Sequence, residues 1–338
     1  MGLLEAVEFL LEKGYRPQRS FYLAFGHDEE THGLDGAKHI SSLLKSRNIT
    51  FEYILDEGSF VFDKMFPGIH FPIALVGISE KGMLNLDLTV KDNPGHSSFP
   101  KRETPIIVLS KAVSKLEGDV FPSMFGKGPE VTMLEELAYC VPFPLKVVLS
   151  NIWLFKPFIP LFMRDPASSA FHRTTTAVTI IKGGHKVNVI PNSATASVNF
   201  RIHPGQTTSE ATDYVRRIIN DDRVQIKVLY ESHPHPVSPI DSFGYLTLKK
   251  SIKQLYNDSC VLPTLLIANT DTRWYLDLSK SIYRFSLVRM NLNETGRVHG
   301  NNEKIAVKNY IDIVNFYLHL IKNSDELEVV MKHSHSEL

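Results

Sequence analysis

The hydrophobic pattern of the first sixty residues alternates between helical and extended segments. Apolar positions in residues 3–12 recur at the spacing of an amphipathic helix that starts almost at residue 1. Two short apolar runs, residues 21–25 and 53–55, predict buried strands, and each run is followed closely by carboxylates. Because helix and strand alternate over residues 3–58, we expect an α/β domain with a sheet covered by helices.

A different pattern begins at residue 83, where leucine or valine alternates with polar residues, as in a half-buried antiparallel strand. Four such strands are predicted, at 83–91, 175–182, 194–202 and 224–230. Helical spacing predicts helices at 104–117 and 208–219. The resulting order β-α-β-β-α-β indicates a compact α+β domain inserted between the two halves of the first domain.

The pattern of the first domain returns after Pro239. We expect a helix near 242–256 and strands near 264–268 and 282–287. A long amphipathic helix closes the domain, with an apolar face formed by Ile305, Tyr310, Ile313, Val314, Tyr317 and Leu320. The predicted division is therefore a first domain in two parts, an inserted domain and a tail: 1–80 with 236–325, 81–235, and 326–338.

Residues 120–170 do not follow the simple pattern of the inserted domain. The stretch 141–163 is strongly apolar and contains four prolines and two lysines. Four prolines exclude a regular membrane-spanning helix. Two interpretations stay open. The stretch either forms helices packed on the inserted domain or at a subunit interface, or forms a wall for an apolar substrate chain or a lipid surface.

The composition is that of an ordinary soluble protein, with 338 residues, 43% hydrophobic and 22% charged. The 37 basic and 37 acidic residues balance, and no arginine-rich run indicates a nucleic-acid partner. Two cysteines, Cys140 and Cys260, allow at most one internal disulfide and say little about the redox compartment. Acidic residues interrupt the first apolar stretch, so we predict no signal peptide in this chain.

Adjacent carboxylates follow the first predicted strand, in the motif that ends with Glu29 and Glu30. Such neighbours repel each other unless a cation or a proton compensates. Asp56 follows the second predicted strand, and sites in open α/β sheets form beyond the carboxyl ends of strands. We therefore expect Glu29, Glu30 and Asp56 to belong to one metal site. The alternative, that the glutamates cap a helix beginning near Leu34, leaves Asp56 unexplained.

Zinc binds histidine nitrogen and carboxylate oxygen, and catalytic zinc sites leave a position open for water. Glu29 and Glu30 can divide the work, one binding metal and the other accepting the proton of the water. His299 lies in a polar loop before the last helix and is a candidate ligand. His96, in the turn 95–100, is either a plain turn residue or a donor to a developing oxyanion.

Asn188 and Arg201 supply an amide and a guanidinium in the inserted domain. Arg201 is suited to bind a carboxylate through two parallel hydrogen bonds, or it pairs with an acid within that domain.

Together these motifs resemble the dinuclear zinc peptidases, a family that includes aminoacylase, carnosinase, carboxypeptidase S and glutamate carboxypeptidase. They occur in the order of that family and span nearly the whole chain: GHDEE (26–30), LDEG (55–58), GHSSFP (95–100), NVIP (188–191), NFRIHPGQ (199–206), NTDTR (269–273) and HGNNE (299–303). The resemblance implies a zinc-exopeptidase-like catalytic domain with a mixed, mainly parallel sheet, and an inserted lid or dimerisation domain.

The resemblance also implies a role for each candidate residue. Glu29 matches the general base, Glu30 and His299 match ligands of one zinc, and Asp56 matches a ligand of the other. His96 matches the lid histidine that stabilises the oxyanion, in some members across a dimer interface. The positions that match substrate-binding residues are Asn188, Arg201, Asn269, Thr270, Asp271 and Arg273.

Within the family the chain resembles secreted vertebrate members that hydrolyse, and in reverse form, N-fatty-acyl amino acids. The apolar stretch at 120–170 is similar as well. The resemblance implies a secreted enzyme with two zinc ions in its complete site and a fatty acyl amino acid as substrate. It further implies a homodimer through the lid and contact with a lipid or lipoprotein surface.

The family carries a His-x-Asp motif and a bridging aspartate upstream of the region that matches residue 1. We therefore expect this chain to be an N-terminally truncated form, with His27, Asp28 and His32 as conceivable substitute ligands. Two other functions stay open: a non-catalytic remnant that binds acyl ligands or dimerises, and a dipeptidase or short-chain aminoacylase of the same family.

Overall fold

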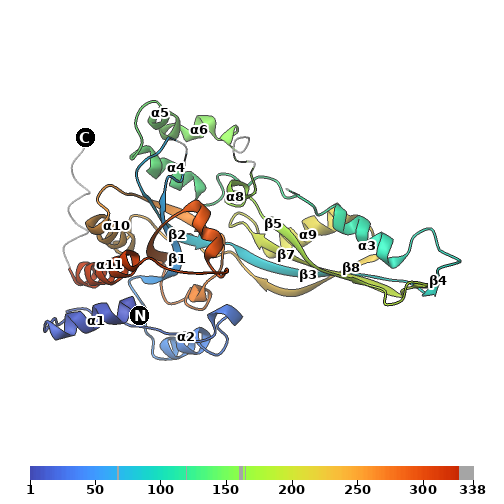
Figure 1. The fold of residues 1–338 in the computed structure, drawn as a ribbon, viewed down its shortest axis with the longest axis horizontal. Coiled ribbons are helices and arrows are strands. Elements are labelled where there is room, and N and C mark those ends of the chain that lie inside the picture. The colour runs from blue at the N-terminus through green and yellow to red at the C-terminus, as the bar shows by residue number, and fades with distance from the viewer. Residues whose placement is uncertain (67, 119, 160–162, 164, 327–338) are drawn as a thin grey trace. The chain divides into compact units, whose positions relative to one another are not determined.

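The computed structural model describes most of the chain, namely residues 1–66, 68–118, 120–159, 163 and 165–326. Within this range the chain forms two compact units (Figure 1). Unit 1 contains Met1–Ser79, Val131–Ile152 and the described residues from Val237 onward. Unit 2 contains Glu80–Glu130 and the described residues of Trp153–Pro236. No helix in the described part is long and apolar enough to span a membrane.

Unit 1 is built on a four-stranded mixed sheet in the order β1-β10-β2-β9. Its strands are β1 (Ile54–Asp63), β2 (Ile73–Glu80), β9 (Cys260–Leu266) and β10 (Ile282–Asn291). β1 runs parallel to β10, whereas β2 is antiparallel to both. The strands predicted near 53–55, 264–268 and 282–287 are confirmed, although β9 begins earlier than expected and ends at Leu266. β2 was not predicted, although a short continuous apolar run of this kind is consistent with a buried strand.

Helices cover the sheet of unit 1 and bury its apolar side chains. The main ones are α1 (Gly2–Glu12), α2 (Ala37–Ser46), α10 (Phe243–Leu255) and α11 (Val307–Asp325). α11 packs on α1, α10 and β10, and Phe316 joins Leu248 and Phe285 in the core. The predicted closing helix is confirmed except at Ile305, which precedes α11 and is 48% exposed.

The strand predicted at 21–25 is wrong. The segment is irregular, and Tyr22 and Phe25 are 51% and 59% exposed. An apolar run becomes a strand only when a neighbouring strand pairs with its backbone groups. None of the described strands pairs with this segment.

Unit 2 contains an antiparallel sheet in the order β5-β7-β3-β8. Its strands are β3 (Gly82–Lys91), β5 (Thr175–Gly183), β7 (Ser193–Ile202) and β8 (Val224–Ser232). Helices α3 (Pro105–Ser114) and α9 (Thr208–Ile219) bury one face of it. A small sheet pairs β4 (Gly95–His96) with β6 (Val189–Ile190). The predicted order β-α-β-β-α-β is confirmed.

The apolar stretch forms short helices rather than a long one: α4 (Glu130–Ala138), α5 (Leu145–Ser150), α6 (Ile152–Phe155) and α8 (Pro166–Ser169). Residues 131–152 group with unit 1, although the sequence placed them in the inserted domain. A disulfide between Cys140 and Cys260 joins the end of α4 to β9, with the Cα atoms 6.1 Å apart. This bond ties the apolar stretch to the sheet of unit 1. Of the predicted tail, residues 327–338 lie outside the described residues.

Replacing both cysteines with serine is expected to lower the free energy of unfolding by about 4 kcal/mol, because a long loop is no longer closed in the unfolded chain. The loop spans 120 residues. Guanidinium unfolding followed by circular dichroism measures the change. Wild-type protein in reducing buffer is the control and should match the variant. Equal unfolding midpoints for the variant and the oxidised wild type would contradict the prediction.

Candidate functional site

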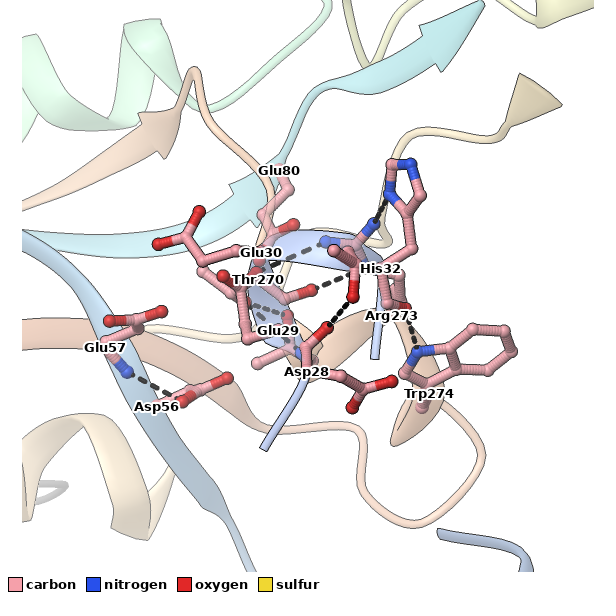
Figure 2. Close-up of polar contacts among 12 residues, drawn as sticks. Asp28, Glu29, Glu30, His32, Asp56, Glu57, Glu80, Thr270, Arg273 and Trp274 are labelled. Atoms are coloured by element: carbon pink, nitrogen blue, oxygen red, sulfur yellow. Dashed lines mark hydrogen bonds and ion pairs between the residues drawn. The ribbon is translucent and has the colours of Figure 1, made fainter. Parts of the chain in front are cut away.

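The loop 26–36 gives its three consecutive acidic residues different surroundings (Figure 2). Glu29 and Glu30 begin a short 3-10 helix, η1 (Glu29–Thr31). The carboxylate of Asp28 instead accepts the backbone N–H groups of Asp35 at 2.7 Å and Gly36 at 2.9 Å, just before α2. Asp28 therefore closes the loop ahead of the helix. Each oxygen of Asp28 accepts one of these bonds, and the pair holds the carboxylate toward the start of α2.

Glu29 is the most perturbed carboxyl of this loop. Burial, followed by the negative charges of Glu57 and Asp271, raises the pKa of Glu29 to about 7, while Arg273 opposes the rise. Nη2 of Arg273 lies 3.5 Å from Oε1 of Glu29. A carboxyl whose pKa lies near neutrality is suited to accept a proton from water and then release it.

Asp56 and Glu57 lie where β1 departs from regular pairing with β10. Asp56 does not end its strand as predicted, because β1 continues to Asp63 after a register shift between Asp56 and Ser59. Gly58 has φ +155°, and a Cβ there would lie 2.5 Å from the Cβ of Arg284. Such irregularities redirect side chains. Glu57 comes close enough to raise the pKa of Glu29, a role that the LDEG motif alone did not reveal.

Two of the predicted metal ligands, Glu30 and His299, come together. Nδ1 of His299 lies 3.7 Å from Oε1 of Glu30, and both side chains are largely exposed. An imidazole and a carboxylate are suitable zinc donors, but a catalytic zinc takes three protein ligands. Over the described ranges, no group of three or more His, Cys, Asp or Glu residues is placed to hold a metal ion. The described residues therefore supply only part of a zinc site.

The predicted substrate-binding loop 269–273 packs against the loop of Glu29. Its residues form a second 3-10 helix, η2 (Asp271–Trp274). Arg273 donates from Nε to the carbonyl of Thr270 at 2.8 Å, and its Nη1 lies 3.4 Å from Nδ1 of His32. Trp274 Nε1 donates to the carbonyl of His32 at 2.9 Å. Because Nδ1 of His32 accepts from Arg273, the proton of the neutral ring lies on Nε2.

Asn269 and Asp271 complete this loop. Asn269 is half-buried at the start of the turn. The carboxylate of Asp271 lies against Gly26 and Gly33, where a Cβ on Gly26 would stand 2.9 Å from Oδ2. Burial raises the pKa of Asp271. The negative charge of Asp271 in turn raises the pKa of Glu29.

Arg284, near the start of β10, was missed by the sequence analysis. The residue is fully buried, and its Nε and Nη2 donate to Oγ1 of Thr272 at 3.1 and 2.9 Å. A third nitrogen, Nη1, donates to the carbonyl of Ile282 at 2.9 Å. The signal was present, because an arginine inside an otherwise apolar strand indicates a specific buried partner.

In unit 2, His96 and Asn188 lie side by side. The N–H of Ser97 donates to the carbonyl of Asn188 at 3.1 Å, and His96 pairs with Val189. The N–H of Ser98 donates to Nδ1 of His96 at 3.2 Å. In the neutral ring, that bond places the proton on Nε2, which can then donate to an oxyanion.

Arg201 does not join His96 within unit 2. It lies near the end of β7, while Asn188 precedes the start of β7 at Ser193. Eight extended residues separate Ser193 from Arg201, roughly 26 Å of strand. Burial and the charge of Arg201 lower the pKa of Lys81 to about 7. The two candidate substrate-binding ends of unit 2 are therefore far apart in one chain.

Comparisons with known proteins show what the inserted unit and the whole chain are similar to. The family model described as the peptidase dimerisation domain, M20_dimer, matches residues 78–227. The N-fatty-acyl-amino acid synthase/hydrolase PM20D1 of Xenopus tropicalis is 46% identical over 327 residues, 96% of this chain and 64% of that protein. Human PM20D1 is 46% identical over 339 residues, covering 99% and 67%. A probable carboxypeptidase S-like 2 of Dictyostelium discoideum is 44% identical over 337 residues, covering 96% and 63%.

The chain thus spans 63% to 67% of the length of these curated relatives. Among solved structures, an M20 family metallo-carboxypeptidase from Sulfolobus solfataricus has a TM-score of 0.65 at 16% identity, covering 96% of this chain and 74% of that one. Human carnosine dipeptidase 1 has a TM-score of 0.61 at 16% identity, covering 96% and 71%. At such identity the likeness shows the fold, and the predicted fold class is confirmed.

Replacing Asp28 with alanine is expected to lower the free energy of unfolding by about 1 to 2 kcal/mol, since two backbone N–H groups lose a charged acceptor. Thermal or urea unfolding measures the loss. Asp35→Ala, an exposed aspartate seven residues further on, is the matched control and should change stability little. If the two variants are equally stable, Asp28 does not hold the loop.

Proposed function

The chain belongs to the M20 peptidase family, and we propose from this premise that the protein is a metal-dependent amidohydrolase acting on N-fatty-acyl amino acids. The observation that carries the proposal is Glu29, a half-buried carboxyl with a pKa raised to about 7, directly before Glu30 and its partner His299. Relatives 43% to 46% identical bear the name N-fatty-acyl-amino acid synthase/hydrolase, which supports this substrate class.

Zinc is the cofactor that we propose. Glu30 and His299 would bind one ion and Asp56 another, and the donor types suit zinc. When bound, the metal polarises the amide carbonyl and activates water. Among these three proposed ligands, the described residues bring Glu30 and His299 together.

Glu29 accepts the proton of the attacking water and then delivers it to the nitrogen of the leaving amino acid. Nε2 of His96 donates a hydrogen bond to the oxyanion of the tetrahedral intermediate. Arg201 binds the carboxylate of the amino acid through two parallel hydrogen bonds. Asn188 and the loop residues 269–271 orient the substrate.

A homodimer through unit 2 accounts for the distance between His96 and Arg201. We propose that His96 serves the site of a second copy, while Arg201 serves its own. β5 is an edge strand of the unit 2 sheet, and its Ile180 and Ile181 are 47% and 60% exposed. An exposed apolar edge is a ready surface for pairing with another chain. The match to a dimerisation domain supports this assignment.

The apolar stretch supports a long acyl chain as part of the substrate. In unit 1, Tyr139 and Phe143 are each 80% exposed, and Val147 is 51% exposed. A cavity of about 190 Å³ opens among Gly68, Ile69, Phe71 and residues 141–145. A dry apolar cavity of roughly 150 Å³ holds a benzene-sized group. We place the acyl chain on this surface, and contact with a lipid or lipoprotein surface is proposed on the same ground.

Secretion is proposed as well. The disulfide between Cys140 and Cys260 supports it, because such bonds persist mainly in oxidising compartments.

Replacing Glu29 with glutamine is expected to lower kcat for a long-chain acyl-phenylalanine by about 10³-fold, because the base is lost. Release of phenylalanine measures turnover, and elemental analysis measures metal per chain, which should stay unchanged. Glu12→Gln, at the end of α1, is the control and should retain full activity. If the Glu29 variant retains turnover, Glu29 is not the base. If the variant loses metal, Glu29 is a metal ligand.

Mixing two inactive variants tests the exchange of His96 between copies. The Glu29→Gln and His96→Ala chains are coexpressed, or unfolded and refolded together. The mixture should regain about a quarter of wild-type activity, since half of the dimers hold one intact site. Glu29→Gln mixed with Glu30→Ala should regain nothing, because both changes damage the same unit 1 site. No recovery in a verified heterodimer of the first pair would contradict the exchange.

A further inference from the structure

A fully buried arginine lies beneath the loop that faces Glu29. Two nitrogens of Arg284 donate to Oγ1 of Thr272, and the third donates to the carbonyl of Ile282. Burying a guanidinium is costly unless its donors are satisfied. The planar fork of arginine also fixes the direction of each bond, which a lysine does not. Thr272 is therefore held in one place and orientation by β10.

Thr272 in turn fixes the turn that presents Arg273. Its hydroxyl is 2.8 Å from the hydroxyl of Thr270, and its N–H donates to Oγ1 of Thr270 at 3.2 Å. The carbonyl of Thr270 accepts Nε of Arg273 at 2.8 Å. A continuous series of hydrogen bonds thus runs from the core strand β10 to the Arg273 guanidinium.

The guanidinium of Arg273 is turned toward the protein. Its side chain is 9% exposed, with Nη2 at 3.5 Å from Glu29 and Nη1 at 3.4 Å from His32. Figure 2 shows Arg273 close to His32 and Glu29. A carboxylate of a substrate would need an open edge of the guanidinium for paired hydrogen bonds. Each edge of the Arg273 guanidinium already faces Thr270, His32 or Glu29.

We propose that Arg273 is a positioning residue for the base Glu29, fixed by Arg284 through Thr272, and not a ligand of the substrate. The inference rests on the proposed role of Glu29. Glu57, Asp271 and Glu30 repel the Glu29 carboxylate, and Arg273 holds it in place against that repulsion. At 3.5 Å the contact orients the carboxylate without a short bond to the oxygen that receives the proton.

A second tie between the two loops allows this role to be tested without loss of the fold. Trp274 Nε1 donates to the carbonyl of His32, so η2 stays attached to the loop of Glu29 when Arg273 is replaced. The values of kcat and KM for the Arg273 variants then distinguish a positioning residue from a ligand of the substrate.

Arg273→Met is expected to lower kcat for a long-chain acyl-phenylalanine about 100-fold and to leave KM within about twofold, because a shift of roughly 1 Å in a reacting group has that effect. Arg273→Lys should recover about tenfold of the loss, since the charge returns without the fork. A KM raised tenfold or more at unchanged kcat would overturn the inference, because Arg273 would then bind substrate.

Thr272 supplies the second measurement. Thr272→Val removes the hydroxyl that Arg284 holds and should lower kcat about tenfold, whereas Thr272→Ser keeps it and should match the wild type. The double variant with Arg273→Met should be no slower than Arg273→Met alone, because both act through one contact. If the losses in kcat of the two single variants multiply in the double variant, Thr272 does not act through Arg273, which would overturn the proposed link from Arg284. If the wild-type protein does not hydrolyse the substrate, the proposed function and this inference both fail. If the wild type is active, the variants test this inference alone.

Discussion

Repulsion between carboxylates is the constraint around which the candidate site is arranged. Glu29 lies among Glu30, Glu57 and Asp271, and together with burial these charges raise its pKa. A partly buried acidic group of this kind persists only when cations and hydrogen bonds compensate. Arg273 supplies the positive charge within unit 1. Burial and the same repulsion, which make the arrangement costly, also give Glu29 the proton affinity that a general base requires.

The elements that carry these groups differ in rigidity. Arg284 belongs to a core strand, and the hydrogen bonds of Thr272 extend that rigidity to η2. Glu30 and His299 lie on exposed loops and approach each other only at 3.7 Å. A metal ion would draw such loops together, since ligands fix loop geometry by coordination. The protein fold therefore fixes the position of Glu29, whereas a bound metal ion would be needed to fix Glu30 and His299.

The regular elements of unit 2 were predictable because local signals agreed with the final packing. α9 spans Thr208–Ile219 as predicted, and Thr207 and Glu210 form a capping box at its start. The segment 21–25 failed for the opposite reason, because a strand depends on a partner elsewhere in the fold. In the site, the motifs indicated Glu29, Glu30 and His299, but not the contacts of Arg284 or Glu57. Those contacts arise from the irregularity at Gly58 and from the packing of η2, which no local pattern specifies.

We propose that this protein hydrolyses amino acids bearing long acyl chains, and kcat/KM for a series of N-acyl-phenylalanines from acetyl to oleoyl measures this preference. We expect kcat/KM to rise with chain length, because each buried methylene adds up to about 0.8 kcal/mol of apolar stabilisation. A maximum at acetyl, with loss of activity on longer chains, would instead indicate a short-chain aminoacylase.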